Sequence, residues 1–237
     1  MSIETLTIGG TDVEVHRKKI KNLHIGVYPP NGYVRVAAPE VLSIDAIRIA
    51  VLTRMGWIRR KQAQFLAQDR QAPRQLVSGE THFLFGRPLR LDVTPWKKKV
   101  HSIAKQGADR LSFLVPEGST VEDRRRWMRN WHRTQLRRVA APRIADWSEV
   151  LGVAPTSWGL RKMKTKWGSC NPGSRIIWLN EELSQKPVEA IDYVILHELA
   201  HLISSRHDES FVAVLDAHLP RWRQIRSELN ALPLSAW

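Results

Sequence analysis

The chain has 237 residues and a formal net charge of +14, from 37 basic and 23 acidic side chains. With 43% hydrophobic and 25% charged residues it has the composition of a globular protein, which excludes a wholly disordered or fibrous chain. A single cysteine excludes an intramolecular disulfide framework and is typical of a reducing compartment. No apolar run approaches the roughly 20 residues of a membrane span, and the first residues lack the pattern of an export signal. We therefore expect a cytoplasmic protein without membrane contact.

The first half of the chain predicts strands around one long helix. Alternating residues with glycine or proline at the turn predict four hairpins, centred on residues 9–10, 29–32, 86–88 and 106–107. Between the second and third hairpins, Ser43 is a typical helix N-cap, and apolar residues keep helical spacing from Ile44 to Ile58, in a helix expected to run on to about Gln68. We therefore expect a β-rich N-terminal region with one long helix over residues 1–115.

The second half is predicted to be mostly helical. A long helix is expected over Val121–Leu151, interrupted at Pro142 because proline cannot continue the helical hydrogen-bond ladder. Downstream of it the sequence predicts a short strand, a loop, a second strand and further helices, over 160–163, 167–170, 175–179 and the residues beyond Pro187. Together the two halves predict an α+β fold with a soft boundary near residue 116, so that residues 116–237 form a second region.

One helical segment of this second region carries the residues most typical of a metal site. Its apolar positions recur at three- and four-residue steps and would be buried: Val188, Ile191, Ile195, Leu199 and Leu202. His197 and His201 lie four residues apart, one turn above each other, so both imidazoles can reach one zinc ion at about 2.0–2.1 Å. Glu198 lies about 100° further round the helix, where its carboxylate can reach a water molecule on that ion.

A third ligand can come from His207, six residues beyond His201. On an uninterrupted helix His207 would point about 120° away from His201, so it can bind the same ion only if the helix ends first. Ser204 and the residues after it provide an exit, because serine weakens helix interiors. Glu209 is the alternative third ligand, and we favour His207 because three neutral imidazoles form a known catalytic zinc site.

The chain resembles the YgjP-like zinc metallopeptidases, which are grouped with SprT-like and other compact zincins. Five segments in the same order carry this resemblance: 161–170 ending in Trp-Gly-Ser-Cys, 177–180, 192–202 containing His-Glu-Leu-Ala-His, 207–211, and Leu219-Pro220. The resemblance covers nearly the whole chain. It implies a zincin-like catalytic core, with the active-site helix against a small mixed sheet, preceded by a β-rich N-terminal part. It also implies that His197, His201 and His207 bind one Zn²⁺ and that Glu198 is catalytic.

The expected function is that of a zinc metallopeptidase acting on a protein or peptide. Glu198 would take a proton from zinc-bound water, whose pKa falls to roughly 7, and return it to the leaving amine. A nucleotide pyrophosphatase is the alternative, because that activity has also been attributed to the group, and a non-catalytic nucleic-acid-binding protein is a distant third. Tyr193 and His218 are available as oxyanion stabilisers, although packing roles are favoured for both.

The strand at 175–179 and the Trp-Gly-Ser-Cys segment have two interpretations each. A peptide substrate could pair with the edge of the strand, or its apolar residues could simply pack in the sheet. Trp167 and Cys170 are typical of a packed turn, and the resemblance implies that they shape the loop near the metal. We do not expect Cys170 to be a ligand.

The basic residues raise the question of anionic partners. Two stretches concentrate them, Arg124–Arg138 and Arg161–Lys166. A solvated basic face is the default interpretation, and association with nucleic acid or nucleotides is the alternative.

Overall fold

The computed structural model describes residues 3–28, 32–67 and 74–231. It divides the chain into two compact units, Met1–Asp69 and Arg70–Trp237. The division therefore lies well before the predicted boundary near residue 116. Its physical cause is helix α3 (Val121–Leu151), which packs both on the sheet that precedes it and on the core that follows it, and so joins the two into one unit.

The first unit is a four-stranded sheet with two helices. The sheet has the order β1-β2-β4-β3, formed by β1 (Ile3–Ile8), β2 (Thr11–Lys18), β3 (His24–Tyr28) and β4 (Tyr33–Pro39). The first two predicted hairpins are present as β1–β2 and β3–β4, although the turn at 29–31 lies outside the described residues. Ser43 caps α1 (Ile44–Thr53), its hydroxyl accepting from the Ala46 N–H at 3.2 Å.

The single helix predicted to reach Gln68 is two helices. The first, α1, ends at Thr53 and is capped by Arg54, whose N–H bonds to the carbonyls of Val51 and Leu52. The second, α2 (Met55–Ala67), begins directly after Arg54. Gln68 itself lies outside the described residues. Buried valine and isoleucine side chains from the sheet and both helices, such as Val36, Ile47 and Ile58, form the core of this unit.

The second unit begins with another four-stranded sheet, of order β5-β6-β8-β7. Its strands are β5 (Thr81–Leu84), β6 (Arg87–Trp96), β7 (Ser102–Gln106) and β8 (Arg110–Pro116). Gly86 and Gly107 adopt positive φ angles of 80° and 61° in the two predicted hairpin turns, a conformation that favours glycine. Alternating residues of β6 and β8 are buried together with Met128 of α3.

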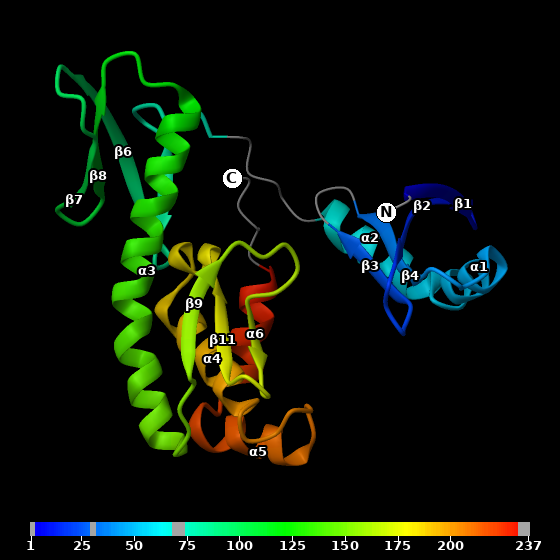
Figure 1. Cartoon of the computed structure of the whole chain (residues 1–237). Helices are drawn as coiled ribbons and strands as arrows, with labels where there is room; N and C mark the ends of the chain where they lie inside the picture. The colour runs from blue at the N-terminus through cyan, green and yellow to red at the C-terminus, as the bar shows by residue number, and fades with distance from the viewer. Residues whose placement is uncertain (1–2, 29–31, 68–73, 232–237) are drawn as a thin grey trace. The chain divides into compact units, whose positions relative to one another are not determined.

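Helix α3 is continuous, contrary to the interruption expected at Pro142 (Figure 1). Proline removes one helical hydrogen bond, but burial on both sides of it keeps the two halves in one line. Leu136, Ala140 and Ile144 are buried in the same core. Thr120 and Asp123 form a capping box at the start of the helix, and Gly152 ends it in the left-handed conformation.

The rest of the second unit is a small mixed sheet covered by helices. The sheet has the order β10-β11-β9, from β9 (Ser157–Arg161), β10 (Gly168–Asn171) and β11 (Ile176–Asn180). The 3₁₀ helix η1 (Glu181–Gln185), α4 (Val188–Ala200), α5 (Glu209–His218) and α6 (Trp222–Ala231) follow. This arrangement confirms the predicted α+β class, with one helix of the candidate site packed against a small mixed sheet. Among the described residues, none of the helices combines the length and apolar character of a membrane span.

One prediction about this sheet is wrong, and one open choice between two interpretations is decided. The segment at 167–170 was expected to be a loop, but Gly168–Asn171 forms strand β10, antiparallel to β11. Strand β11 pairs with β10 on one side and with β9 on the other, so it is central and has no free edge. The packing interpretation of residues 175–179 is therefore correct, and the edge strand beside the candidate site is β10.

Candidate metal centre

Helix α4 is almost entirely buried. It contacts α3, the small sheet and α6, and most of its residues are buried in the core that these elements share. A helix buried in this way is apolar on nearly all sides, so each of its few polar side chains needs a specific explanation. Glu198 is 5% exposed, while His197 and His201 are partly exposed at the end of the helix that opens to solvent.

The three predicted histidines come together at this end. Each offers a ring nitrogen, and these nitrogens all lie within 4.8 Å of one another. The Nε2 atoms of His197 and His207 are 3.2 Å apart. Two nitrogen ligands at about 2.0–2.1 Å from a tetrahedral ion are separated by about 3.3 Å, so this spacing suits a shared cation. Glu209, the alternative third ligand, is not part of the group.

The chain turn that brings His207 back is built from short polar residues. Helix α4 ends at Ala200, and the N–H of Ser204 bonds to the Ala200 carbonyl at 2.9 Å. The Ser204 hydroxyl then donates to the carboxylate of Asp208, at 2.9 and 3.0 Å to its two oxygens. Asp208 in turn caps α5 by accepting from the Phe211 N–H at 3.0 Å. The predicted exit from the helix is thus present, and it begins slightly earlier than Ser204.

The imidazoles of His197 and His201 are suited to bind a cation because burial favours their neutral form. Burial lowers the pKa of His197 to about 3, assisted by His201 and His207, and burial also lowers the pKa of His201. Nδ1 of His201 lies 3.2 Å from the Ser204 carbonyl, which fixes a proton there and leaves Nε2 for a metal. Phe211 packs against all three rings, with centroid distances of 4.7–5.0 Å.

Glu198 is positioned by strand β10. Its carboxylate lies so close to Gly168 that a Cβ atom at that position would be 2.5 Å from Oε1 and 2.7 Å from Cγ. The backbone N–H of Cys170 also donates to the carboxylate. Burial raises the pKa of Glu198 to about 7, and the nearby Lys166 acts in the opposite direction. The carboxylate of Glu198 therefore occupies the space that a side chain at Gly168, in the Trp-Gly-Ser-Cys segment, would fill.

A cavity of about 360 Å³ opens over these residues. Its walls are residues 165–170, five residues at or near the end of α4, His207, and two residues of α6, Arg226 and Asn230. The five are Tyr193, Val194, His197, Glu198 and His201. Trp167 joins two of these walls, because its Nε1–H donates to Oδ1 of Asn230 at 3.2 Å. The sequence pattern did not place Arg226 or Asn230 at the site, since helix α6 contains no motif that points to it.

The remaining candidates take structural or boundary positions. The side chain of Cys170 lines the cavity outside the histidine group, and burial and Glu198 raise the pKa of its thiol to about 11. Tyr193 stacks on Trp222 at the cavity wall, with ring centroids 6.3 Å apart. His218 is not a lining residue and packs edge-on against Trp147, as expected for a structural role.

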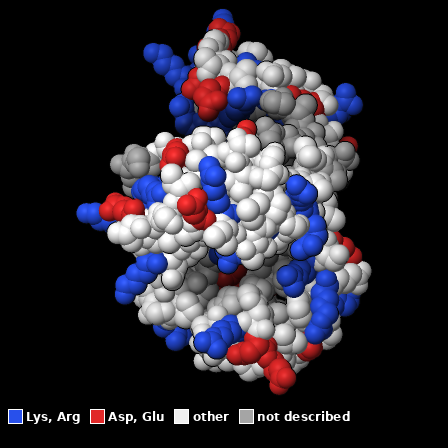
Figure 2. All heavy atoms as spheres, turned by 90° about the vertical axis from the view of Figure 1, so that its right-hand side faces the viewer, with Lys and Arg blue, Asp and Glu red and all other residues white. Residues whose placement is uncertain are grey.

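Most arginines of α3 are engaged within the protein. They contact backbone carbonyls, carboxylates or an aromatic ring: Arg124 with Leu76, Arg125 with Arg74, Arg126 with Asp123, Arg133 with Glu181, and Arg137 with Trp158. On the face shown in Figure 2, lysine and arginine side chains are dispersed and do not gather in one patch. Many of the arginines of α3 thus contact neighbouring elements of the protein.

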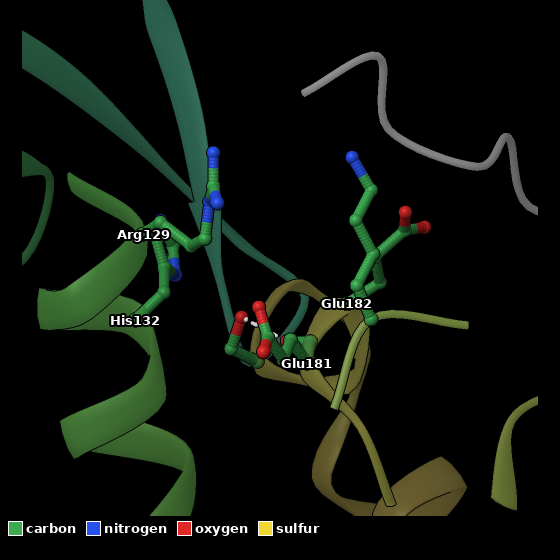
Figure 3. A pocket seen from close by; sticks show the side chains of 6 residues that line it. Arg129, His132, Glu181 and Glu182 are labelled. Carbon is green, nitrogen blue, oxygen red and sulfur yellow. Dashed lines mark hydrogen bonds between the residues drawn. The ribbon is translucent and has the colours of Figure 1, made fainter. Parts of the chain in front are cut away.

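A second hollow lies between α3 and η1 (Figure 3). Arg129 and His132 of α3 face Glu181 and Glu182 of η1 across it. Its volume is about 10 Å³, which is room for one water molecule at most. The large cavity over the histidines is therefore the better candidate for a substrate site.

Comparison with known proteins gives a family match and weaker structural likenesses. The model of the family described as "YgjP-like, metallopeptidase domain" matches residues 21–232. The zymogen of the metallopeptidase abylysin from Pyrococcus abyssi is 22% identical, with a TM-score of 0.36 over 38% of this chain and 90% of its own. The zymogen of jannalysin from Methanocaldococcus jannaschii is 21% identical, with a TM-score of 0.35 over 38% of this chain and 86% of its own. No curated protein matches the sequence.

Proposed function

The chain belongs to the YgjP-like family of metallopeptidase domains, and from this premise we propose that it is a zinc-dependent peptidase with Glu198 as general base. The observation that supports this most directly is the group of three histidine nitrogens within 4.8 Å, at the floor of a cavity that also contains Glu198. The sequence expectation of a metallopeptidase is confirmed at the level of the family. Zinc and the role of Glu198 are our proposal.

The donor set favours zinc. Three neutral imidazoles are typical ligands of catalytic zinc, and hard ions such as Mg²⁺ or Ca²⁺ prefer oxygen ligands. His197, His201 and His207 would hold the ion. When bound, zinc polarises a peptide carbonyl and makes water more acidic.

Glu198 supplies the proton transfers. Its carboxylate is buried beside the histidines and has a pKa raised to about 7, near the value at which one group can both accept and release a proton at neutral pH. Glu198 takes a proton from water as the water attacks the carbonyl carbon. It then gives the proton to the amine nitrogen as the peptide bond breaks.

The substrate would lie along β10. The Trp167 carbonyl accepts the Asn180 N–H of β11 at 2.8 Å, so this side of the strand is used within the sheet. Backbone groups of a strand alternate in direction, and Gly168 and Cys170 therefore point theirs away from β11. The Cys170 N–H is used by Glu198, and Gly168, Ser169 and Cys170 line the cavity. An extended peptide can pair with such an edge.

Substitution of Glu198 by glutamine tests this proposal. We expect Glu198→Gln to retain stoichiometric zinc and to cleave peptides at least about 100-fold more slowly, the usual scale of general-base catalysis. Metal analysis and initial rates on a mixed peptide library would measure both. Full peptidase activity in the zinc-loaded variant would contradict the role of Glu198. Turnover of nucleoside triphosphates without turnover of any peptide would instead support phosphoanhydride hydrolysis.

A further inference from the structure

We infer that Lys166 and Arg226 bind a carboxylate of the substrate, so that the cavity selects acidic peptides. This inference rests on the proposed peptidase function and names its substrate class. Both residues line the cavity, and they come from different walls. Lys166 belongs to the segment before β10, and Arg226 lies on α6.

The two cations flank the metal centre. Lys166 is near enough to Glu198 and His201 to lower the pKa of each, and Arg226 does the same to His197. Among the described residues that line the cavity, Glu198 is the only one with a carboxylate. With a divalent ion on the histidines, the cavity would carry a strong positive potential, which favours a negatively charged ligand.

Neither cation, Lys166 or Arg226, has a hydrogen-bond or ion-pair partner for its side chain among the described residues. Both side chains are exposed. Arg223, one turn away on α6, is the contrast, because it is paired with the carboxylate of Asp216. The charge of Arg223 is therefore neutralised locally, whereas that of Arg226, which lines the cavity, has no such partner among the described residues.

The backbones that carry both cations are held in place. The buried side chain of Asn180 donates from Nδ2 to the Lys166 carbonyl at 2.8 Å. The hydrogen bond from Trp167 to Asn230 links the same segment to α6. Lys166 and Arg226 thus come from two walls that this hydrogen bond joins. A planar guanidinium can bind a carboxylate through two parallel hydrogen bonds, with a lysine ammonium as a second point charge.

Acidic and neutral versions of the same peptide test this inference. The carboxylate could belong to an acidic side chain or to the peptide C-terminus, so one set of peptides exchanges Glu for Gln and another exchanges the free acid for the amide. We expect kcat/KM of the zinc-loaded protein to be about ten- to a hundredfold higher for the charged member of at least one pair, the range of charge-assisted hydrogen bonds. The pair that responds identifies the source of the carboxylate.

Matched variants assign the preference to these residues. Lys166→Met and Arg226→Met should each reduce the preference, and the double variant should abolish it. Lys164→Met in the same segment and Arg223→Met on the same helix, which lie outside the cavity lining, should leave it unchanged. A preference that persists in the double variant, or equal rates for charged and neutral peptides in the wild type, would overturn the inference.

A binding measurement separates this inference from the proposed function. The affinity of each peptide pair, and of a nucleoside triphosphate, is measured for zinc-loaded Glu198→Gln by calorimetry. Tighter binding of the acidic peptide without cleavage in the wild type would support the inference while contradicting the peptidase proposal. Tighter binding of the nucleotide than of the acidic peptide, or no binding of either peptide, would overturn the inference.

Discussion

At the scale of single residues, the closest fit in the site is between Gly168 and Glu198. No other residue type leaves space for the carboxylate at this position, because even a methyl group would overlap Oε1. The same strand supplies the Cys170 N–H to that carboxylate. The strand therefore determines where the carboxylate lies relative to the histidines, and Gly168 acts as a positioning residue.

We expect Gly168→Ala to lower kcat by about 100-fold, the effect of displacing a reacting group by about 1 Å, while zinc content and KM change little. Gly173→Ala in the following turn is the control, because a Cβ atom there meets no atom closer than 3.5 Å. Steady-state kinetics and metal analysis measure these changes. In a Glu198→Asp background the shorter side chain should relieve the overlap, so the alanine should have a smaller effect there. Equal effects in both backgrounds would contradict the positioning role.

The ligand residues could be predicted from the sequence, and their neighbours could not. His197, His201 and Glu198 lie within one helix, so helical geometry alone relates them. The sequence alone does not decide whether His207 or Glu209 is the third ligand, because that depends on where the chain turns after α4. The contact between Gly168 and Glu198, and the position of Arg226, join segments distant in sequence. No local pattern can show such contacts.

At the scale of elements, the junction of α4 and α5 determines whether His207 reaches the other two histidines. The conformation of this junction depends on Asp208. The carboxylate of Asp208 accepts hydrogen bonds from the hydroxyls of Ser204 and Ser210 and from the Phe211 N–H. These hydrogen bonds lower the pKa of Asp208 to about 2. The cap of α5 and the exit from α4 therefore share one side chain.

We expect Asp208→Ala to weaken zinc binding several-fold, because His207 loses its fixed approach when the cap is removed. Asp208→Asn should retain most of the affinity, since asparagine is an equally good N-cap. Competition with a chromophoric chelator measures both affinities. Unchanged zinc affinity in Asp208→Ala would show that the ring packing of Phe211 alone positions His207.

Local patterns predicted the elements well where local forces determine them. The hairpin turns and the Ser43 cap belong to this class. The continuity of α3 at Pro142 and the strand at 168–171 are not determined by local forces, and both were predicted wrongly. The proline is tolerated because one side of α3 is buried both before and after it, and Gly168–Asn171 becomes a strand because β11 is available as its partner. Tertiary contacts decided both.

At the scale of the whole molecule, the basic residues behind the net charge of +14 have different roles in different places. Arginines of α3 attach the helix to its surroundings, and Lys166 and Arg226 remain directed to the cavity. A polyanion partner for the dispersed basic residues remains a prediction. The division at residues 69 and 70 also places α3 with both the sheet β5–β8 and the metal site, so the stability of this second unit depends on the contact between α3 and that sheet.

Two histidines are buried at this contact, His82 on β5 and His132 on α3. Burial lowers the pKa of His132 to about 3 and that of His82 to about 4. Arg74 lowers the pKa of both further, and Glu80 acts against the shift of His82. In the unfolded chain a histidine has a pKa of about 6.5, so the unfolded state binds protons first as the pH falls.

The contribution of these two histidines to the stability of the second unit should therefore be complete above about pH 6.5. It should be lost progressively as the pH falls toward about 4 for His82 and about 3 for His132, by at most ~1.4 kcal/mol per pH unit for each histidine. Urea unfolding with chelator present, followed by tryptophan fluorescence, measures this, because Trp57 is the only one of the ten tryptophans that precedes residue 70. Replacing His132 by glutamine should reduce the pH dependence, and replacing the exposed His24 should not. The same dependence in His132→Gln as in the wild type would assign acid sensitivity elsewhere, since the histidines of the metal centre are present in both proteins and contribute equally.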